Sequence, residues 1–345
     1  MVLARIVLIE LWIGVTAYAL FAGADFGGGI WDLLAGGPGR GAPVRERIEH
    51  SIGPVWEANH VWLIFVLVTL WTAFPVVFSS LLSTLYIPFS VAGLGIILRG
   101  SSFALRKEAQ PLRLRRLFGV LFATSSLLTP FAFGTVAGAV ASGRVPSGIA
   151  VGDVIGAWLN PTALFGGFMA VATCAYLAAV YLTADARRAG EVSLVPYFRR
   201  RAMITGAALG VVGLAGGLLV IHGDAPALFT GLTGRALPLL GASAAFGLAS
   251  LLLLRLQRYV LVRGTAGLAT VAAIWSWGVA QYPALLPPAL TLDNSAAPDP
   301  VLWALAIGLG VGAALFVPAL ILLYGLAQGV VAPESAGAPA RGRWR

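Results

Sequence analysis

The chain has 345 residues, of which 59% are hydrophobic and only 11% are charged, whereas soluble domains usually carry about 25% charged residues. Its mean hydropathy of +0.88 excludes both a soluble globular protein and a disordered one. The net charge is +9, and every basic residue except Lys107 is an arginine. The single cysteine, Cys174, excludes intrachain disulfides, a four-cysteine iron–sulfur cluster and a zinc ribbon.

Nine stretches are apolar enough to cross a bilayer, which takes roughly 20 residues. In chain order they cover residues 4–24 or as far as 34, 54–73, 77–98, 117–140, 161–183, 202–221, 236–254, 260–281 and 301–327. Pro75 marks a tight reversal between the second and third spans. The first span contains acids and lacks a basic leader, so we expect a retained helix rather than a cleaved signal peptide.

The loops between these spans are short, so no separate extramembrane domain is expected. The sequence predicts an all-α integral membrane protein with one transmembrane domain over residues 1–331. Residues 332–345 are rich in Ala, Pro, Gly and Arg, which predicts a flexible tail.

The basic residues separate by side when nine spans alternate in direction. Of the 23 Lys and Arg residues, 20 fall in one set of segments and 3 in the other. The rich set comprises the segments near 35–53, 99–116, 184–201 and 255–263 and the tail after 328. Because positively charged loops stay in the cytoplasm, the N-terminus is predicted outside and the C-terminus in the cytoplasm. Topology and anionic lipid therefore explain the charge without a nucleic-acid partner.

Ionisable residues inside a membrane are costly and are functional candidates by default. Asp25 follows an apolar run and precedes three glycines, Gly27–Gly29. Near the C-terminal end of its helix, a carboxylate opposes the helix dipole and needs a cation, a donor or a proton. The alternative is a capping or interfacial acid before a break that glycine permits. Glu10 lies nearer the outer face, as a relay member, a helix contact or an acid reaching the surface.

A second group of polar residues lies at the start of the second span. Glu57 and His60 are three residues apart and so share a helix face, flanked by Asn59 and Trp62. Glu57 is either a first-turn acid stabilised by the helix dipole or a carboxyl that exchanges protons near the cytoplasmic surface. The Glu57-x-x-His60 spacing also occurs in di-iron bundles, but those need a second copy, which this sequence lacks.

Two motifs resemble subunit II of cytochrome bd quinol oxidases. Residues 23–29, GADFGGG, are similar to that family's first-helix motif, and residues 53–75, beginning GPVWEANHVW, are similar to its second-helix motif. Weaker similarities occur at Leu159-Asn160-Pro161 and at 290–295. The residues expected to maintain these motifs structurally are Gly27, Gly29, Trp56 and Trp62.

The resemblance implies a terminal oxidase of the bacterial cytoplasmic membrane that passes electrons from quinol to O₂ and forms water. It implies two subunits of similar fold, each with two four-helix bundles plus one peripheral helix. Haem b and haem d would be ligated by the partner, subunit I, and none by this chain. Membrane lipid and, where present, small accessory subunits would be further partners.

The resemblance also implies a cytoplasmic proton path. Glu57 matches the position associated with that path and Asp25 a polar position near it, with Asn59 and His60 beside them. The chain departs from the family at Ala22, where an acid is common, and at Ala24, where Phe is common. His60 falls where the family varies, so we do not expect it to be a haem ligand.

Two other functions are compatible with the residues. One is a proton-coupled secondary transporter, although transporters usually have broken helices in matched halves and nine spans do not divide evenly. The other is a structural scaffold of the oxidase without a proton role, which mutation of Glu57 would distinguish.

The charge separation predicts the orientation of the chain. A reporter fused after Arg345 should read as cytoplasmic, and one inserted in the 282–300 loop should read as external, because the basic segments stay inside. Alkaline phosphatase and green fluorescent protein fusions would measure this. The opposite result at either place would contradict the count of nine spans.

Overall fold

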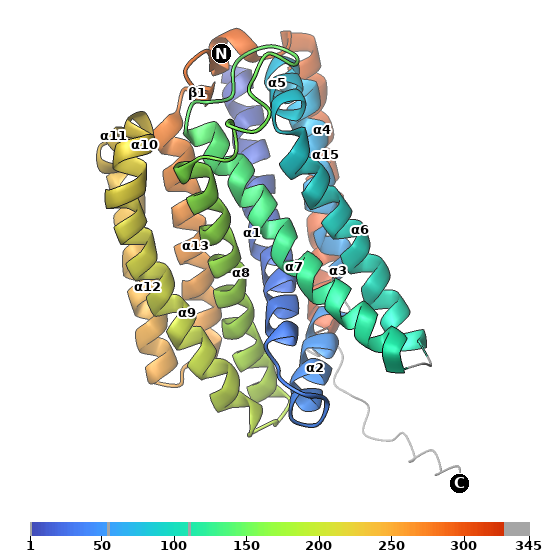
Figure 1. The fold of residues 1–345 in the computed structure, drawn as a ribbon. Helices are drawn as coiled ribbons and strands as arrows, with labels where there is room; N and C mark the ends of the chain where they lie inside the picture. Colours follow the sequence, from blue (N-terminus) through green and yellow to red (C-terminus); the bar gives the residue numbers. More distant parts are fainter. Residues whose placement is uncertain (1, 54–55, 110–111, 328–345) are drawn as a thin grey trace.

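The structure, a computed structural model, describes residues 2–53, 56–109 and 112–327, and these are almost entirely helical (Figure 1). The helices of the first half are α1 (Val2–Leu33), α2 (Pro38–Ile52), α3 (Trp56–Asn59), α4 (Val61–Ala73), α5 (Pro75–Thr84), α6 (Tyr86–Glu108) and α7 (Leu112–Ala141). The second half has α8 (Pro161–Arg188), α9 (Leu194–Gly216) with a π-helical turn η1 (Gly217–Ile221), α10 (His222–Asp224), α11 (Pro226–Thr233), α12 (Leu237–Arg255), α13 (Tyr259–Gln281), β1 (Ala284–Leu286), β2 (Leu290–Thr291), α14 (Leu292–Ser295) and α15 (Asp299–Ala327).

The described residues contain eight helices that are long and apolar enough to cross a membrane. A ninth span is present if the bent pair Gly39–Ile52 and Trp56–Ala73, which meet at 58°, is counted as one. The expectation of an all-α membrane protein is therefore confirmed. The tail at 332–345 lies outside the described residues, and the boundary of the single domain stays a prediction.

The second and third spans differ from their predicted bounds. The stretch 54–73 is interrupted at His60, which lies between α3 and α4. Pro75 does not start the third span but a separate ten-residue helix, α5, and the apolar helix that follows covers Tyr86–Arg106 rather than 77–98. The predicted loop at 35–53 is largely the helix α2, and a two-stranded hairpin, β1–β2, joins α13 to α14. Proline at a first helical turn is favourable, which explains why Pro75 begins a helix instead of a plain turn.

Helix α1 lies in the middle of the molecule (Figure 1). It packs against α7 and α8 and also contacts α4, α13 and α15. The neighbouring pairs α6–α7, α8–α9 and α12–α13 pack along their lengths. The layout of two four-helix bundles plus one peripheral helix stays a prediction.

Glycine residues allow α1 to approach its neighbours closely. A Cβ atom at Gly27 would lie 1.9 Å from the carbonyl oxygen of Cys174 in α8, and one at Gly29 would lie 2.1 Å from the Oγ of Ser126 in α7. The alternative of a helix break at these glycines is excluded, because α1 continues to Leu33, close to the longer predicted end at 34. Because these glycines have no side chain, the backbone of α1 can pack directly against α7 and α8, as small residues allow in membrane helices.

Ion pairs join the ends of the helices. Asp32, near the end of α1, binds Arg45 of α2 at 3.0 Å and Arg106 of α6 at 2.6 Å. At the opposite end, Asp224 pairs with Arg144 of the α7–α8 loop. These contacts join segments far apart in sequence at the boundaries where the chain meets water.

The close contact of Gly27 predicts that a methyl group there is destabilising. Gly27→Ala should lower the free energy of unfolding by about 1–3 kcal/mol, because α1 and α8 must move apart to admit the Cβ atom. Thermal unfolding in detergent, followed by tryptophan fluorescence, would measure the loss.

Gly210→Ala in α9 is the matched control, since nothing lies within 4 Å of its Cβ position. It should be neutral or should stabilise the helix by up to about 1 kcal/mol. Equal melting temperatures for the two variants would contradict the packing role of Gly27.

Candidate functional site

Asp25 lies inside α1 and not at its end, which excludes the alternative that it caps the helix. Its side chain is buried, and α1 continues for eight residues to Leu33, or about 12 Å at the rise of an α-helix. Burying a carboxyl group in an apolar environment is costly unless hydrogen bonds or a charge compensate it. The neighbouring helices supply both.

Asn59 supplies the hydrogen bond. It is the last residue of α3 and is buried, and its Nδ2 donates to the Oδ2 of Asp25. The same amide lies 3.5 Å from the carbonyl oxygen of Phe21, one turn earlier in α1. The two sequence motifs therefore meet directly across α1 and α3, which their spacing of 34 residues did not reveal.

Arg99 supplies the charge, and the sequence analysis missed it. It was assigned to the cytoplasmic segment 99–116, but it lies within α6 and its side chain is only 1% exposed. It interacts electrostatically with Asp25, and its guanidinium lies 5.1 Å from the ring centre of Phe26 and 5.2 Å from that of Phe122. An arginine directly after an apolar run was the available signal for a buried charge. It was overlooked because the span was predicted to end at Leu98.

A serine orients the arginine. The Nε of Arg99 donates to the Oγ of Ser126 at 3.2 Å, and that hydroxyl in turn donates to the carbonyl oxygen of Phe122 at 2.7 Å. Ser126 is fully buried and lies against Gly29, where any larger residue would displace it. Gly29 therefore supports the site indirectly, by leaving room for the residue that holds Arg99.

His60 and Tyr18 complete the buried group. The ring centre of His60 lies 6.0 Å from that of Tyr18 and 6.1 Å from that of Phe26. Within the described part of the chain, the Nδ1 of His60, the Oη of Tyr18 and the Nη2 of Arg99 are buried without a hydrogen-bond partner. We call Tyr18, Asp25, Asn59, His60 and Arg99 the Asp25 cluster.

Glu57 is not part of the Asp25 cluster. Its side chain is exposed, and that carboxyl group makes no hydrogen bond or ion pair with any residue that the structure describes. Side chains two positions apart in an α-helix point about 200° apart around the helix axis. In α3, Asn59 therefore points inward and Glu57 points outward. Glu57 and His60 do lie one turn apart, since the backbone N–H of His60 donates to the carbonyl oxygen of Glu57 at 3.2 Å, but only His60 reaches Tyr18 and Phe26.

The remaining motif residues lie in helix contacts. Trp56 packs on His60, with ring centres 6.4 Å apart, and on Phe103 of α6 at 5.9 Å. Trp62 packs on Phe316 of α15 at 5.6 Å. Both tryptophans therefore fix how α3 and α4 are seated against their neighbours.

The two weaker motifs are helix caps. The Oδ1 of Asn160 accepts a hydrogen bond from the backbone N–H of Ala163 at 2.9 Å, and Pro161 follows as the first residue of α8. Thr291 and Asn294 form a reciprocal capping box at the start of α14. Such side chains satisfy backbone groups that a helix start leaves unpaired.

Other ionisable groups lie away from the Asp25 cluster. Glu10 is half-buried, and its Oε2 has no hydrogen-bond partner among the described residues. The Nδ1 of His50 lies 2.8 Å from the carbonyl oxygen of Glu46, and the ring of His222 packs on Phe229. Among residues 2–53, 56–109 and 112–327, no group of three or more His, Cys, Asp or Glu side chains could hold a metal ion.

The comparisons with known proteins agree with this architecture. The family model described as cytochrome bd terminal oxidase subunit II matches residues 3–327, nearly the whole chain. The chain belongs to this family. In fold it is similar to the bd oxidase from Geobacillus thermodenitrificans, with a TM-score of 0.72 and 24% sequence identity over 94% of this chain and 98% of that one.

Two curated relatives give the same family. Cytochrome bd ubiquinol oxidase subunit 2 of Bacillus subtilis (strain 168) is 25% identical over 180 residues, which are 50% of this chain and 52% of the relative. Cytochrome bd-I ubiquinol oxidase subunit 2 of Escherichia coli (strain K12) is 27% identical over 184 residues, or 51% and 47%. The aligned part thus spans about half the length of each relative.

The Asp25 cluster predicts that Arg99 and Asp25 depend on each other for stability. Arg99→Met should lower the free energy of unfolding by about 1–3 kcal/mol, because it removes the buried guanidinium that interacts electrostatically with Asp25 and donates to Ser126. Asp25→Asn in the same chain should recover part of that loss.

A double-mutant cycle on thermal unfolding would measure the coupling between the two residues. Strictly additive effects of Arg99→Met and Asp25→Asn would show that the two side chains are independent and would refute the cluster as an electrostatic unit.

Proposed function

We propose that this chain is the haem-free subunit of a membrane-bound quinol oxidase that reduces O₂ to water and that it carries protons to the reaction. Its family and the names of its relatives support the oxidase assignment. The proposed partner is subunit I, which would hold haem b and haem d. The three histidines of this chain lie apart from one another, on the exposed face of α2, at an aromatic contact and within the Asp25 cluster, which supports haem ligation by the partner.

The observation that carries the proton role is the Asp25 cluster. It brings a carboxyl group, an amide and an imidazole together between the packed helices. The carboxyl group of Asp25 lies about 12 Å along α1 from the end of that helix. Buried polar atoms are nearly always hydrogen-bonded. The atoms of His60, Tyr18 and Arg99 that lack a partner among the described residues therefore call for other partners, and ordered water is the common one. Titratable groups joined by water form a path along which protons move.

Glu57 is the proposed entry group. It precedes an exposed apolar face of α4 formed at helical spacing by Val61, Ile64, Val68 and Trp71. Trp71 is 63% exposed, although it lies in a spanning helix. Subunit I would cover this face, so Glu57 would lie at the subunit boundary between cytoplasmic water and the Asp25 cluster.

The alternative of a proton-coupled transporter has no specific observation in its favour. The purely structural alternative treats Glu57 as a stabiliser of the α3 start. It is distinguished from the proton role by the following experiment.

Glu57→Gln keeps the size of the side chain but removes its exchangeable proton. In the complex with subunit I, it should preserve assembly and the haem absorption bands and strongly slow quinol-driven O₂ consumption. Glu57→Asp should be milder because it retains a carboxyl group. If Glu57 only stabilises a helix start, the loss should be about 0.3–1 kcal/mol of stability with turnover intact.

Glu46→Gln in α2 is the matched control, because Glu46 is another exposed acid in a segment predicted to be cytoplasmic. It should leave O₂ consumption unchanged. Asp25→Asn should slow turnover like Glu57→Gln. Wild-type turnover in a Glu57→Gln enzyme with a normal haem spectrum would refute the role of Glu57 in proton entry.

A further inference from the structure

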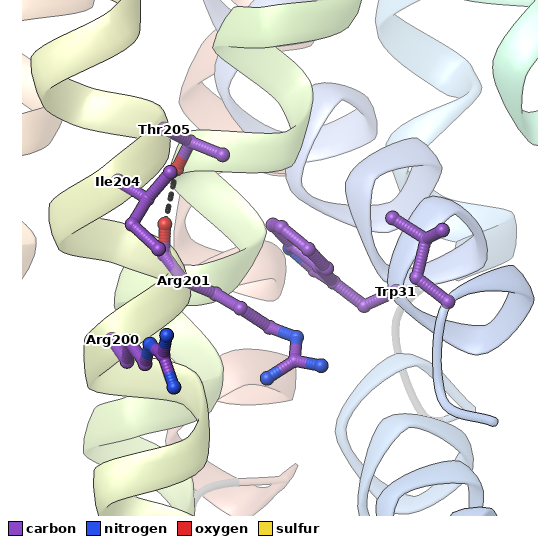
Figure 2. Close-up of a pocket in the computed structure, with 6 residues that line it drawn as sticks. Trp31, Arg200, Arg201, Ile204 and Thr205 are labelled. Carbon is purple, nitrogen blue, oxygen red and sulfur yellow. Dashed lines mark hydrogen bonds between the residues drawn. The ribbon is translucent and has the colours of Figure 1, made fainter.

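A groove lies where the end of α1 faces the first turns of α9, on the side predicted to be cytoplasmic. Its volume is about 420 Å³, and it is lined by Trp31, Leu34, Arg200, Arg201, Ile204 and Thr205. Figure 2 shows Arg201 extending from α9 toward Trp31 of α1, with Arg200 beside it on the same helix. We propose that this groove binds an anionic phospholipid of the cytoplasmic leaflet.

The arginines of the groove lack an anion. Arg201 donates from Nη1 to the carbonyl oxygen of Tyr197 at 3.3 Å and lies over the Tyr197 ring and 5.6 Å from the ring centre of Trp31. Neither Arg200 nor Arg201 forms an ion pair with a residue that the structure describes. A half-buried guanidinium without a carboxylate is a ready partner for a phosphate group, which it can bind through two N–H donors.

Three of the acids at this end of the molecule have arginine partners outside the groove. Three acids hold four other arginines: Asp32 holds Arg45 and Arg106, Glu191 holds Arg47, and Asp185 holds Arg263. The groove therefore keeps two positive charges that the protein itself does not neutralise. This charge imbalance selects a negatively charged ligand.

The walls of the groove select a lipid rather than a free anion. Leu34 and Ile204 are 55% and 57% exposed, and the apolar face of α9 continues beyond them through Val211 and Leu214, each 69% exposed. An acyl chain can follow this face toward the middle of the bilayer while its headgroup stays at the arginines.

Trp31 gives the groove a fixed wall. Its Nε1 donates to the carbonyl oxygen of Ala175 at 2.8 Å, so the ring is held in place and has no donor left for the ligand. Tryptophan is enriched at this depth of a membrane, where apolar and wet regions meet. The groove thus combines a cationic rim, a rigid aromatic wall and an apolar exit.

Lipid binding to the purified oxidase tests this proposal. The complex would be delipidated in neutral detergent and titrated with phosphatidylglycerol, phosphatidylcholine or inorganic phosphate, with bound lipid counted by native mass spectrometry. We expect a site for phosphatidylglycerol that Arg200→Gln/Arg201→Gln weakens roughly tenfold or more, because two cationic contacts are lost. Arg200→Lys/Arg201→Lys should retain most of the binding.

Arg255→Gln/Arg258→Gln is the matched control. It removes two exposed arginines that lie at the same end of the molecule but do not line the groove. It should bind phosphatidylglycerol as wild type does. Equal losses in both double variants would reveal a general charge effect and overturn the proposal, as would unchanged binding in the groove variant. Equal occupancy by phosphatidylcholine would contradict selection by charge. A response to inorganic phosphate as strong as that to phosphatidylglycerol would contradict selection by an acyl chain.

Discussion

A carboxyl group inside a membrane needs partners, and that requirement organises the core of this protein around Asp25. The amide of Asn59 and the guanidinium of Arg99 come from α3 and α6, so three helices must hold a defined relative position for the carboxyl group to be tolerated. Serine and glycine act one step further away, because Ser126 orients Arg99 and Gly29 leaves space for Ser126. One buried polar group thus also determines how the apolar helices around it pack.

The close approach of α1 to its neighbours answers a second constraint. Apolar side chains gain little by leaving lipid for another helix, so contact between membrane helices depends on tight packing and internal hydrogen bonds. Gly27 brings the backbones of α1 and α8 together, and the indole of Trp31 adds a hydrogen bond between the same helices. The central position of α1 follows from these contacts with helices on several sides.

Much of the architecture was predictable from local sequence, since long apolar stretches predict membrane helices directly. The pairing of Asp25 with Asn59 was not, because the residues were identified separately and their contact depends on how α3 folds back on α1. Arg99 was missed since an error of several residues in one span moved it from a helix to a loop. Glu57 and His60 lie one turn apart as expected, but only His60 reaches the cluster, because the seating of this turn against α1 is a tertiary feature that spacing does not report.

The contact between α1 and α8 gives the molecule a built-in chemical reporter. Cys174 is the single cysteine of the sequence, its side chain is buried, and its Sγ lies 3.5 Å from the position that a Cβ atom would take at Gly23. Because this sulfur is buried against α1, a thiol reagent needs an opening of the helix packing to reach it. The rate of alkylation at Cys174 therefore measures opening at the centre of the native protein, without an engineered probe, and distinguishes it from fraying at the helix ends.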